Sequence, residues 1–180
     1  VQAGNPPQEM LGRKCISKTK DSSMTTTNWL SPVQILDSHI LGVNFSIESD
    51  FLPDKPHYLL ASLDMKSNIK NLESVEDMFI CKCILECIGN WTCDKKESTE
   101  SIFSASCKLS IVVAIPKTAF ETIEKEEKDS FITGNAVSIA YGKIRAVIEN
   151  ITAESIVGKQ TILTIDPYTF SISAKNAAKN

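Results

Sequence analysis

Four stretches of this chain alternate apolar and polar residues with a period of two. The clearest covers 103–115, where every odd position from Phe103 to Ile115 is apolar. Because successive side chains of a β-strand point to opposite faces, this alternation predicts a strand with one buried and one solvent-facing side. The other three predicted strands cover 33–48, 58–70 and 78–88.

The predicted strands are joined by short links without a helix between them, as in an antiparallel meander. One amphipathic helix is predicted over 135–155, with Gly158 as its stop. The charged stretch 118–130 is predicted to form a short helix. The expected fold class is therefore α+β, a four-stranded antiparallel meander with one long helix on its apolar face. We expect a flexible arm over 1–30, this domain over 31–173 and a frayed tail over 174–180.

Composition narrows the classes of function. The chain has 180 residues and a net charge of −3, so we expect one domain and no nucleic-acid partner, because no basic surplus is present to bind phosphates. No apolar run approaches the roughly 20 residues needed to cross a bilayer, so no membrane insertion is expected. The first residues contain no apolar stretch typical of a secretory signal, and we expect a cytoplasmic protein.

Six cysteines are present. Cys81, Cys83 and Cys87 share one face of a predicted strand, and Cys107 falls in the apolar register of the next. This placement predicts buried thiols in a reducing compartment. A metal site is the alternative, but the C-x-C-x3-C-x5-C spacing matches no usual zinc pattern. We therefore expect neither a metal nor a cofactor.

The residues needed for catalysis do not form a recognisable set. His39 lies inside a predicted strand and His57 beside prolines in a predicted loop, and both are expected to be structural or exposed. The sequence has no G-x-S-x-G, no glycine-rich phosphate loop and no H-E-x-x-H. We expect a protein that is not an enzyme.

The order of elements over 33–172 resembles the SecB export chaperones. In strand one, LGVNFSIE resembles the V-x-F-E stretch of that family at Val43 and Phe45, with Glu48 nearby. SLDM at 62–65 resembles its alternating L-D-L. Further resemblances fall in the helix and in the segment after it, at Ile139, Tyr141, Arg145, Ile148, Pro167 and Phe170.

Several positions depart from the family pattern. The positions that align with the acidic SecA-docking face are Gly42, Ser46 and Ser106. Gly142 replaces a proline of the main helix, and the C-terminal lid helix is short or absent. These changes put docking to the SecA motor in doubt and fit the divergent SecB-like chaperones found beside toxin–antitoxin pairs.

The resemblance implies an ATP-independent holdase that binds unfolded or extended polypeptide, an antitoxin or a preprotein, in an apolar groove. It also implies a homo-tetramer, a dimer of dimers, with helices packed between two sheets. We expect the groove to be lined by Phe45, Phe51, Leu59, Leu63, Met65, Tyr168 and Phe170. The expected oligomer interface on the helix contains Ile139, Gly142, Lys143, Arg145 and Ala146.

Plain core packing remains an alternative for each groove residue. Two other functions also remain open at this point: a non-catalytic scaffold or adaptor that binds one specific protein, and a binder of a small ligand enclosed between sheet and helix.

Overall fold

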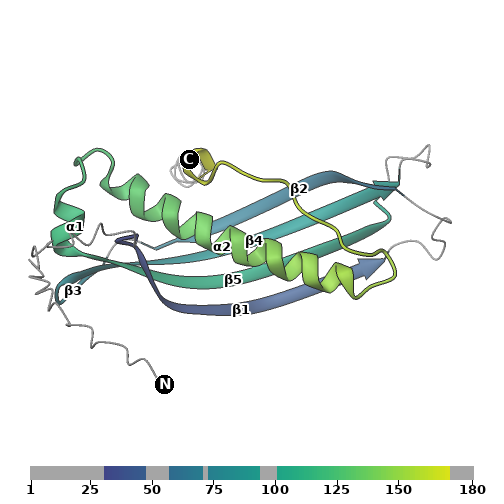
Figure 1. Ribbon diagram of the computed structural model, residues 1–180, viewed down its shortest axis with the longest axis horizontal. Helices are drawn as coiled ribbons and strands as arrows, with labels where there is room; N and C mark the ends of the chain where they lie inside the picture. The colour runs from purple at the N-terminus through teal and green to yellow at the C-terminus, as the bar shows by residue number, and fades with distance from the viewer. Residues whose placement is uncertain (1–30, 48–56, 71–72, 94–100, 171–180) are drawn as a thin grey trace, which may run out of the picture. The chain divides into compact units, whose positions relative to one another are not determined.

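A computed structural model of the chain describes residues 31–47, 57–70, 73–93 and 101–170. The elements follow one another as β1 (Gln34–Ile47), β2 (Tyr58–Ile69), β3 (Glu73–Val75), β4 (Met78–Cys93), β5 (Phe103–Pro116), α1 (Lys117–Glu121) and α2 (Lys128–Ala153). Figure 1 shows α2 lying along one face of the antiparallel sheet. The predicted α+β class, with a long helix on the apolar face of an antiparallel sheet, is confirmed.

The connectivity of the sheet differs from a simple meander. The strand order is β1-β5-β4-β2, and the short β3 pairs with β4. Strands β2, β4 and β5 follow the predicted meander, but β1 lies beside β5 and not beside β2, as in a Greek key. Ten residues, 48–57, separate β1 from β2 in the sequence and can span at most about 33 Å, whereas three strand spacings together amount to about 14 Å. The sequence between the two strands is therefore long enough for them to lie at opposite edges of the sheet.

The two central strands are also the two most completely buried. Alternate residues are buried along β5 and, from Cys81 onward, along β4, whereas β1 and β2 contain only exposed or half-buried residues. Central strands pair on both edges and lie under the helix, so a strand with a regular apolar face is stabilised most by burial in a central position. The less regular apolar pattern of β1 is consistent with its place at an edge of the sheet.

Strand β4 is longer than predicted. It continues to Cys93, although the sequence suggested a loop from residue 89. Trp91 is 1% exposed and stacks on Phe103 of β5, with ring centroids 5.0 Å apart and an angle of 11° between the planes. This aromatic pair keeps the two strands together beyond the predicted end.

Helix α2 begins at Lys128, seven residues before the predicted start, and ends at Ala153. Its first turns bury Ile132 and Thr133, so the helix is extended by packing. The stretch 118–130, predicted as one short helix, contains most of the five-residue α1, a turn and the first three residues of α2. Gly158, with φ +69°, lies beyond the helix end and does not stop it directly. The Thr152 hydroxyl accepts a hydrogen bond from the Gln160 backbone N–H at 2.9 Å, and the chain turns back there.

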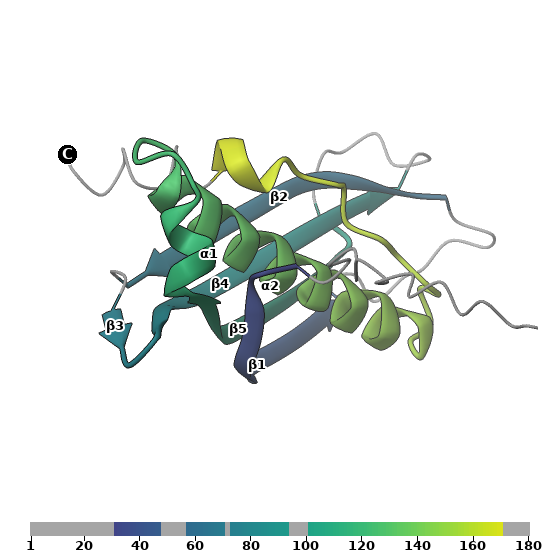
Figure 2. The ribbon, with the colours of Figure 1, turned by 60° about the vertical axis from the view of Figure 1, so that its left-hand side comes forward.

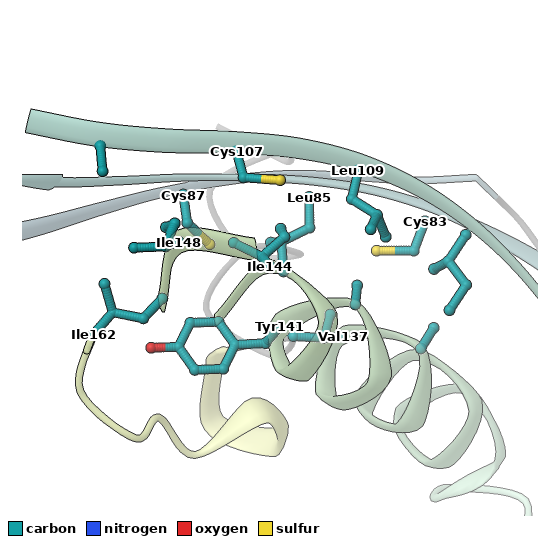
Figure 3. Close-up of a cluster of buried hydrophobic side chains, with 14 of the residues drawn as sticks. Cys83, Leu85, Cys87, Cys107, Leu109, Val137, Tyr141, Ile144, Ile148 and Ile162 are labelled. Atoms are coloured by element: carbon teal, nitrogen blue, oxygen red, sulfur yellow. The ribbon is translucent and has the colours of Figure 1, made fainter. Parts of the chain in front are cut away.

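The core lies between α2 and the helix side of the sheet. Figure 3 shows cysteines and leucines of β4 and β5 facing the side chains of α2 and Ile162. The predicted burial of Cys81, Cys83, Cys87 and Cys107 is confirmed, and each is at most 1% exposed. Burial raises the pKa of Cys83 and of Cys87 to about 12, so these thiols remain protonated at neutral pH.

After α2 the chain runs without regular structure from 158 to 166 and then forms a single helical turn over 167–170. The predicted arm over 1–30 and the predicted tail over 174–180 lie outside the described residues. Neither described helix, α1 or α2, has the length and apolar character to span a bilayer.

Candidate functional site

The outer strands carry apolar residues on the same side of the sheet as α2, but α2 packs mainly against the central strands β4 and β5. In Figures 1 and 2, α2 runs obliquely over the sheet, and its C-terminal end comes near the end of β1. Both outer strands nevertheless keep exposed or half-buried residues along their length. Each edge of the sheet therefore has a surface that the helix does not cover.

The first surface belongs to β1. Residues directly opposite each other in a ladder point to the same face, and Ile35, Ile40, Val43 and Ile47 lie opposite buried residues of β5. These four define the β1-side surface, and they are 46%, 55%, 43% and 36% exposed. Large apolar side chains with this exposure, gathered on one strand, are typical of an interaction surface.

The second surface belongs to β2 and to the segment 159–170. Leu63, Met65 and Ile69 lie opposite Gly89, Cys87 and Cys83 on the helix side, and all three are half-buried against the core. With Leu163, Tyr168 and Phe170 of the segment, they define the β2-side surface. Figures 1 and 2 both show the segment leaving the end of α2, crossing the helix side of the sheet and ending beside β2.

Specific contacts hold the segment in this place. Ile162 is fully buried, and a Cβ atom added to Gly89 would lie 3.3 Å from its side chain. The Tyr141 hydroxyl donates a hydrogen bond to the Leu163 carbonyl. Leu163 itself is 64% exposed and Tyr168 is 44% exposed, so the segment presents apolar atoms to solvent while its backbone is fixed.

A polar network ties the segment to α2. Glu149 accepts hydrogen bonds from Arg145 at 3.1 Å and from Thr161, and Lys159 lies 3.2 Å from its other carboxylate oxygen. The Thr161 hydroxyl, with Lys159 and Arg145, holds the pKa of Glu149 below its ordinary value of 4.5. Glu149 therefore stays ionised at neutral pH and anchors the start of the segment.

A cavity of about 410 Å³ opens where the segment begins. It is lined by His57, Tyr58 and residues 156–160. The Tyr58 hydroxyl is buried and has no hydrogen-bond partner among the described residues, and burial raises its pKa. This mixed polar and apolar cavity is large enough for one aromatic side chain of a bound molecule.

Among the seven predicted groove residues, Leu63 and Met65 lie on the helix side of β2 and pack in part against the core, as Phe170 also does. Tyr168 is 44% exposed and lies beside Gly134 of α2, and the groove itself stays a prediction. Phe45 lies on the helix side of β1, at the opposite edge of the sheet, with its ring centroid 6.0 Å from that of Phe103. Phe51 lies outside the described residues.

The predicted face of Leu59 is wrong. A β-bulge at Ala61 inserts one extra residue between Leu60 and Ser62, so the parity of β2 changes there. Leu59 lies opposite Thr92, on the face away from α2, and is 47% exposed. Tyr58 and Leu60 take the helix side in its place.

The predicted interface residues of α2 fall into two groups. Gly142, Lys143 and Ala146 are exposed on the side of the helix away from the sheet. Ile139 packs in part against the core, and Arg145 bonds Glu149. No atom lies within 4 Å of a Cβ added to Gly142, so nothing in the described part of the chain requires glycine there.

The residues that line the cavity were not predicted from the sequence. The pattern predicts only a loop at His57 and the end of the helix near Gly158. The available signal was the run Leu59-Leu60-Ala61, where three apolar residues interrupt the alternation and indicate a change of parity. That change moves Tyr58 to the helix side, beside the cavity.

Comparison with known proteins supports this fold from structure and not from sequence. No protein-family model matches the chain, and no curated protein matches it. A solved structure of a Mycobacterium tuberculosis protein, the Rv1957 SecB-like chaperone in complex with a ChAD peptide from the Rv1956 HigA1 antitoxin, is similar with a TM-score of 0.50 and 12% identity. The match covers 74% of this chain and 90% of that one.

A protein of unknown function from Streptococcus agalactiae matches with a TM-score of 0.42 and 10% identity, over 74% of this chain and 97% of that one. The antiparallel sheet, the long helix on one of its faces and the first of these two matches agree with the resemblance found in the sequence. This chain therefore has a divergent SecB-like fold.

Proposed function

We propose that this protein is an ATP-independent chaperone, not an enzyme, that holds unfolded or extended polypeptide on its β2-side surface. The observation that carries the proposal is the half-buried apolar row of β2 beside a fixed segment with exposed Leu163 and Tyr168. Burying an apolar side chain of a client contributes about 1.5–3 kcal/mol when it is fully desolvated. Met65 adapts its shape to different side chains, which favours low sequence specificity.

The structural neighbour from Mycobacterium tuberculosis is described as bound to a peptide of an antitoxin, which supports a polypeptide client for this fold. We propose an antitoxin as the client in preference to a preprotein. The sheet face away from α2 carries Gly42, Ser46 and Ser106, and its charges are mixed: Lys66, Lys82 and Lys108 against Asp37, Asp64 and Glu86. An acidic docking face for SecA is therefore not expected.

We further propose a homo-tetramer, a dimer of dimers in which two sheets pair. The β1-side surface provides a candidate contact between paired sheets, because its exposed apolar residues would be buried there. Gly142 and Ala146 on the outer side of α2 leave room for the close approach of a second helix. The buried thiols favour a reducing compartment, and we propose the cytoplasm.

The first test is size-exclusion chromatography with light scattering, for the protein alone and after addition of reduced, carboxymethylated α-lactalbumin, which is permanently unfolded. A tetramer that forms a soluble complex with this probe is the expected result. A protein that ignores the unfolded probe overturns the holdase proposal. A non-catalytic adaptor for one folded partner then becomes the leading hypothesis.

A further inference from the structure

The outer edge of β2 is unpaired in the described part of the chain. The order of the sheet ends at β2, and its twelve residues contain no proline. Its register with β4 runs without interruption from Ser62 to Ile69. An edge of this kind presents a row of N–H and C=O groups that can pair with another extended chain.

One backbone hydrogen bond identifies which groups point outward. The N–H of Lys70 donates to the carbonyl of Lys82 at 2.9 Å, which makes these two residues a hydrogen-bonded pair. Such pairs alternate along an antiparallel ladder. Ser62, Asp64, Lys66 and Asn68 therefore bond to β4, while Leu63, Met65, Ser67 and Ile69 point their N–H and C=O groups away from it.

The other side of β4 gives the same parity independently. The N–H of Lys117 donates to the carbonyl of Asp77 at 2.9 Å, so odd-numbered residues at this end of β4 pair with β5. The even-numbered residues of β4 are left for β2, and their partners are again Ser62, Asp64, Lys66 and Asn68.

The residues with outward backbone groups include those that build the β2-side surface. Leu63, Met65 and Ile69 place their side chains on the helix side and their free N–H and C=O groups at the outer edge. A chain that docks at this edge therefore finds main-chain partners and apolar side chains at the same residues.

We propose that an extended segment of the client pairs with β2 as an added strand, along Leu63 to Ile69. This inference rests on the proposed function and specifies how the client is held. Main-chain hydrogen bonds are independent of client sequence, and alternate client side chains then lie on the helix side, next to the apolar side chains of Leu63, Met65 and Ile69. The partner is thus an unfolded polypeptide with apolar residues at every second position.

The opposite edge fits this role less well. Strand β1 has register shifts between Ile35 and Asp37 and between Ile40 and Gly42, and each places an unpaired extra residue in the strand. Bulges disturb the spacing of the backbone groups and are a common protection of edge strands. We therefore assign the added strand to β2.

The test is residue-resolved amide hydrogen exchange by NMR on the full chain. The probe is a synthetic twelve-residue peptide with leucine and threonine in alternation, and its binding is measured separately by fluorescence anisotropy. The amides of Leu63, Met65, Ser67 and Ile69 are expected to exchange quickly in the free protein and at least tenfold more slowly in the complex. The amides of Asp64, Lys66 and Asn68 are expected to exchange slowly in both states.

The two proposals fail in different ways in this experiment. If the peptide binds and the four outward amides keep their exchange rates, strand addition is wrong while the chaperone proposal stands. If neither this peptide nor the unfolded protein probe binds, both proposals are overturned.

A pair of variants gives a second measurement. Ser67→Pro removes an outward N–H and no bond to β4, and proline is tolerated on edge strands at such positions. Ser67→Ala removes the same hydroxyl and keeps the N–H. With both variants folded by circular dichroism, we expect at least tenfold weaker peptide binding for Ser67→Pro and unchanged binding for Ser67→Ala. Equal binding by the two variants overturns the inference, and if Ser67→Pro does not fold, the exchange experiment decides.

Discussion

The two edges of the sheet both present apolar residues, but they differ in how exposed these residues are and in how regular the backbone is. On the β1 side, four large apolar side chains are 36–55% exposed, and α2 packs mainly against the neighbouring central strands. On the β2 side, Leu63, Met65 and Ile69 are half-buried, and the segment 159–170 runs nearby with its own exposed apolar residues. The backbone differs as well, because β1 contains two bulges and β2 contains one.

This difference separates two kinds of binding surface. On the β2 side, a regular strand edge is accompanied by apolar side chains of β2 itself and of the segment 159–170. This combination suits a narrow, extended polypeptide. The β1 side is broad, apolar and irregular at its edge, which suits a large partner surface that covers many side chains at once. We therefore expect substitutions on one side to affect client binding and substitutions on the other side to affect self-association.

The largest expected effect is on the β1 side. The double substitution Ile40→Asp with Val43→Asp should weaken self-association at least about 100-fold, because each apolar contact is lost in both protomers and the new charges are costly to bury. The fold should persist, since the two side chains are 55% and 43% exposed. Light scattering at several protein concentrations measures the effect. Leu59→Asp is the control, because Leu59 is 47% exposed on the other face, and an unchanged mass for the double variant contradicts the assignment.

The second effect is on the packing of β4 against Ile162, which holds the segment 159–170 in place, and it is measured as a change in the free energy of unfolding. Gly89→Ala places a Cβ atom 2.5 Å from the Trp91 ring and 3.3 Å from Ile162, so one of these buried side chains must move. Overpacking of this kind destabilises a protein by about 1–3 kcal/mol, and urea unfolding measures it. Gly42→Ala on β1 is a matched control, because no atom lies within 4 Å of a Cβ added there, and it should leave stability unchanged or raise it by up to about 1 kcal/mol. Similar effects for the two variants contradict the packing described for Gly89.

The third effect concerns the exposed part of the segment. Tyr168→Asp should weaken binding of the labelled twelve-residue peptide about tenfold, or about 1.4 kcal/mol, because an apolar contact is replaced by a solvated charge. Fluorescence anisotropy with the labelled peptide measures the change, and an unchanged Tm verifies the fold. Leu59→Asp serves as the control here too, since it changes a similarly exposed apolar residue on the other face. If Leu59→Asp weakens binding as much as Tyr168→Asp, the β2-side surface is not the binding site.

The smallest effect is that of pH through Glu149. Its pKa lies below the ordinary value of 4.5, so the ionised carboxylate stabilises the folded state fully above about pH 5, and this contribution is lost as the pH falls through the lowered pKa. Because the network lies near the surface, we expect less than about 1 kcal/mol. Glu149→Gln should lose this contribution at pH 7 and show a flatter dependence of stability between pH 5 and 3. A variant with the same pH profile as the parent contradicts the role of the network.

Most of the fold could be predicted from the sequence, because strands and helices each give a characteristic spacing of apolar residues between near neighbours in the chain. The alternation over 103–115 placed β5 and its buried face correctly, and the helical spacing around Ile144 located most of α2. The predicted groove stays a prediction, but the structure locates several of its residues. Leu63 and Met65 share the helix side of β2, whereas one bulge at Ala61 moves Leu59 to the other face, and the place of β1 beside β5 puts Phe45 at the opposite edge.

The sequence by itself determined which faces of the strands are apolar, where a long amphipathic helix forms and that the thiols of β4 and β5 are buried. These features depend on the spacing of neighbouring residues, which the backbone geometry converts directly into faces. Only the tertiary structure decided the order of the strands, the bulges and which apolar residues remain uncovered beside α2. The strand order and the bulges depend on contacts between residues far apart in the chain. Apolar residues remain uncovered because one helix, about 10–12 Å wide, is too narrow to cover every strand of the sheet.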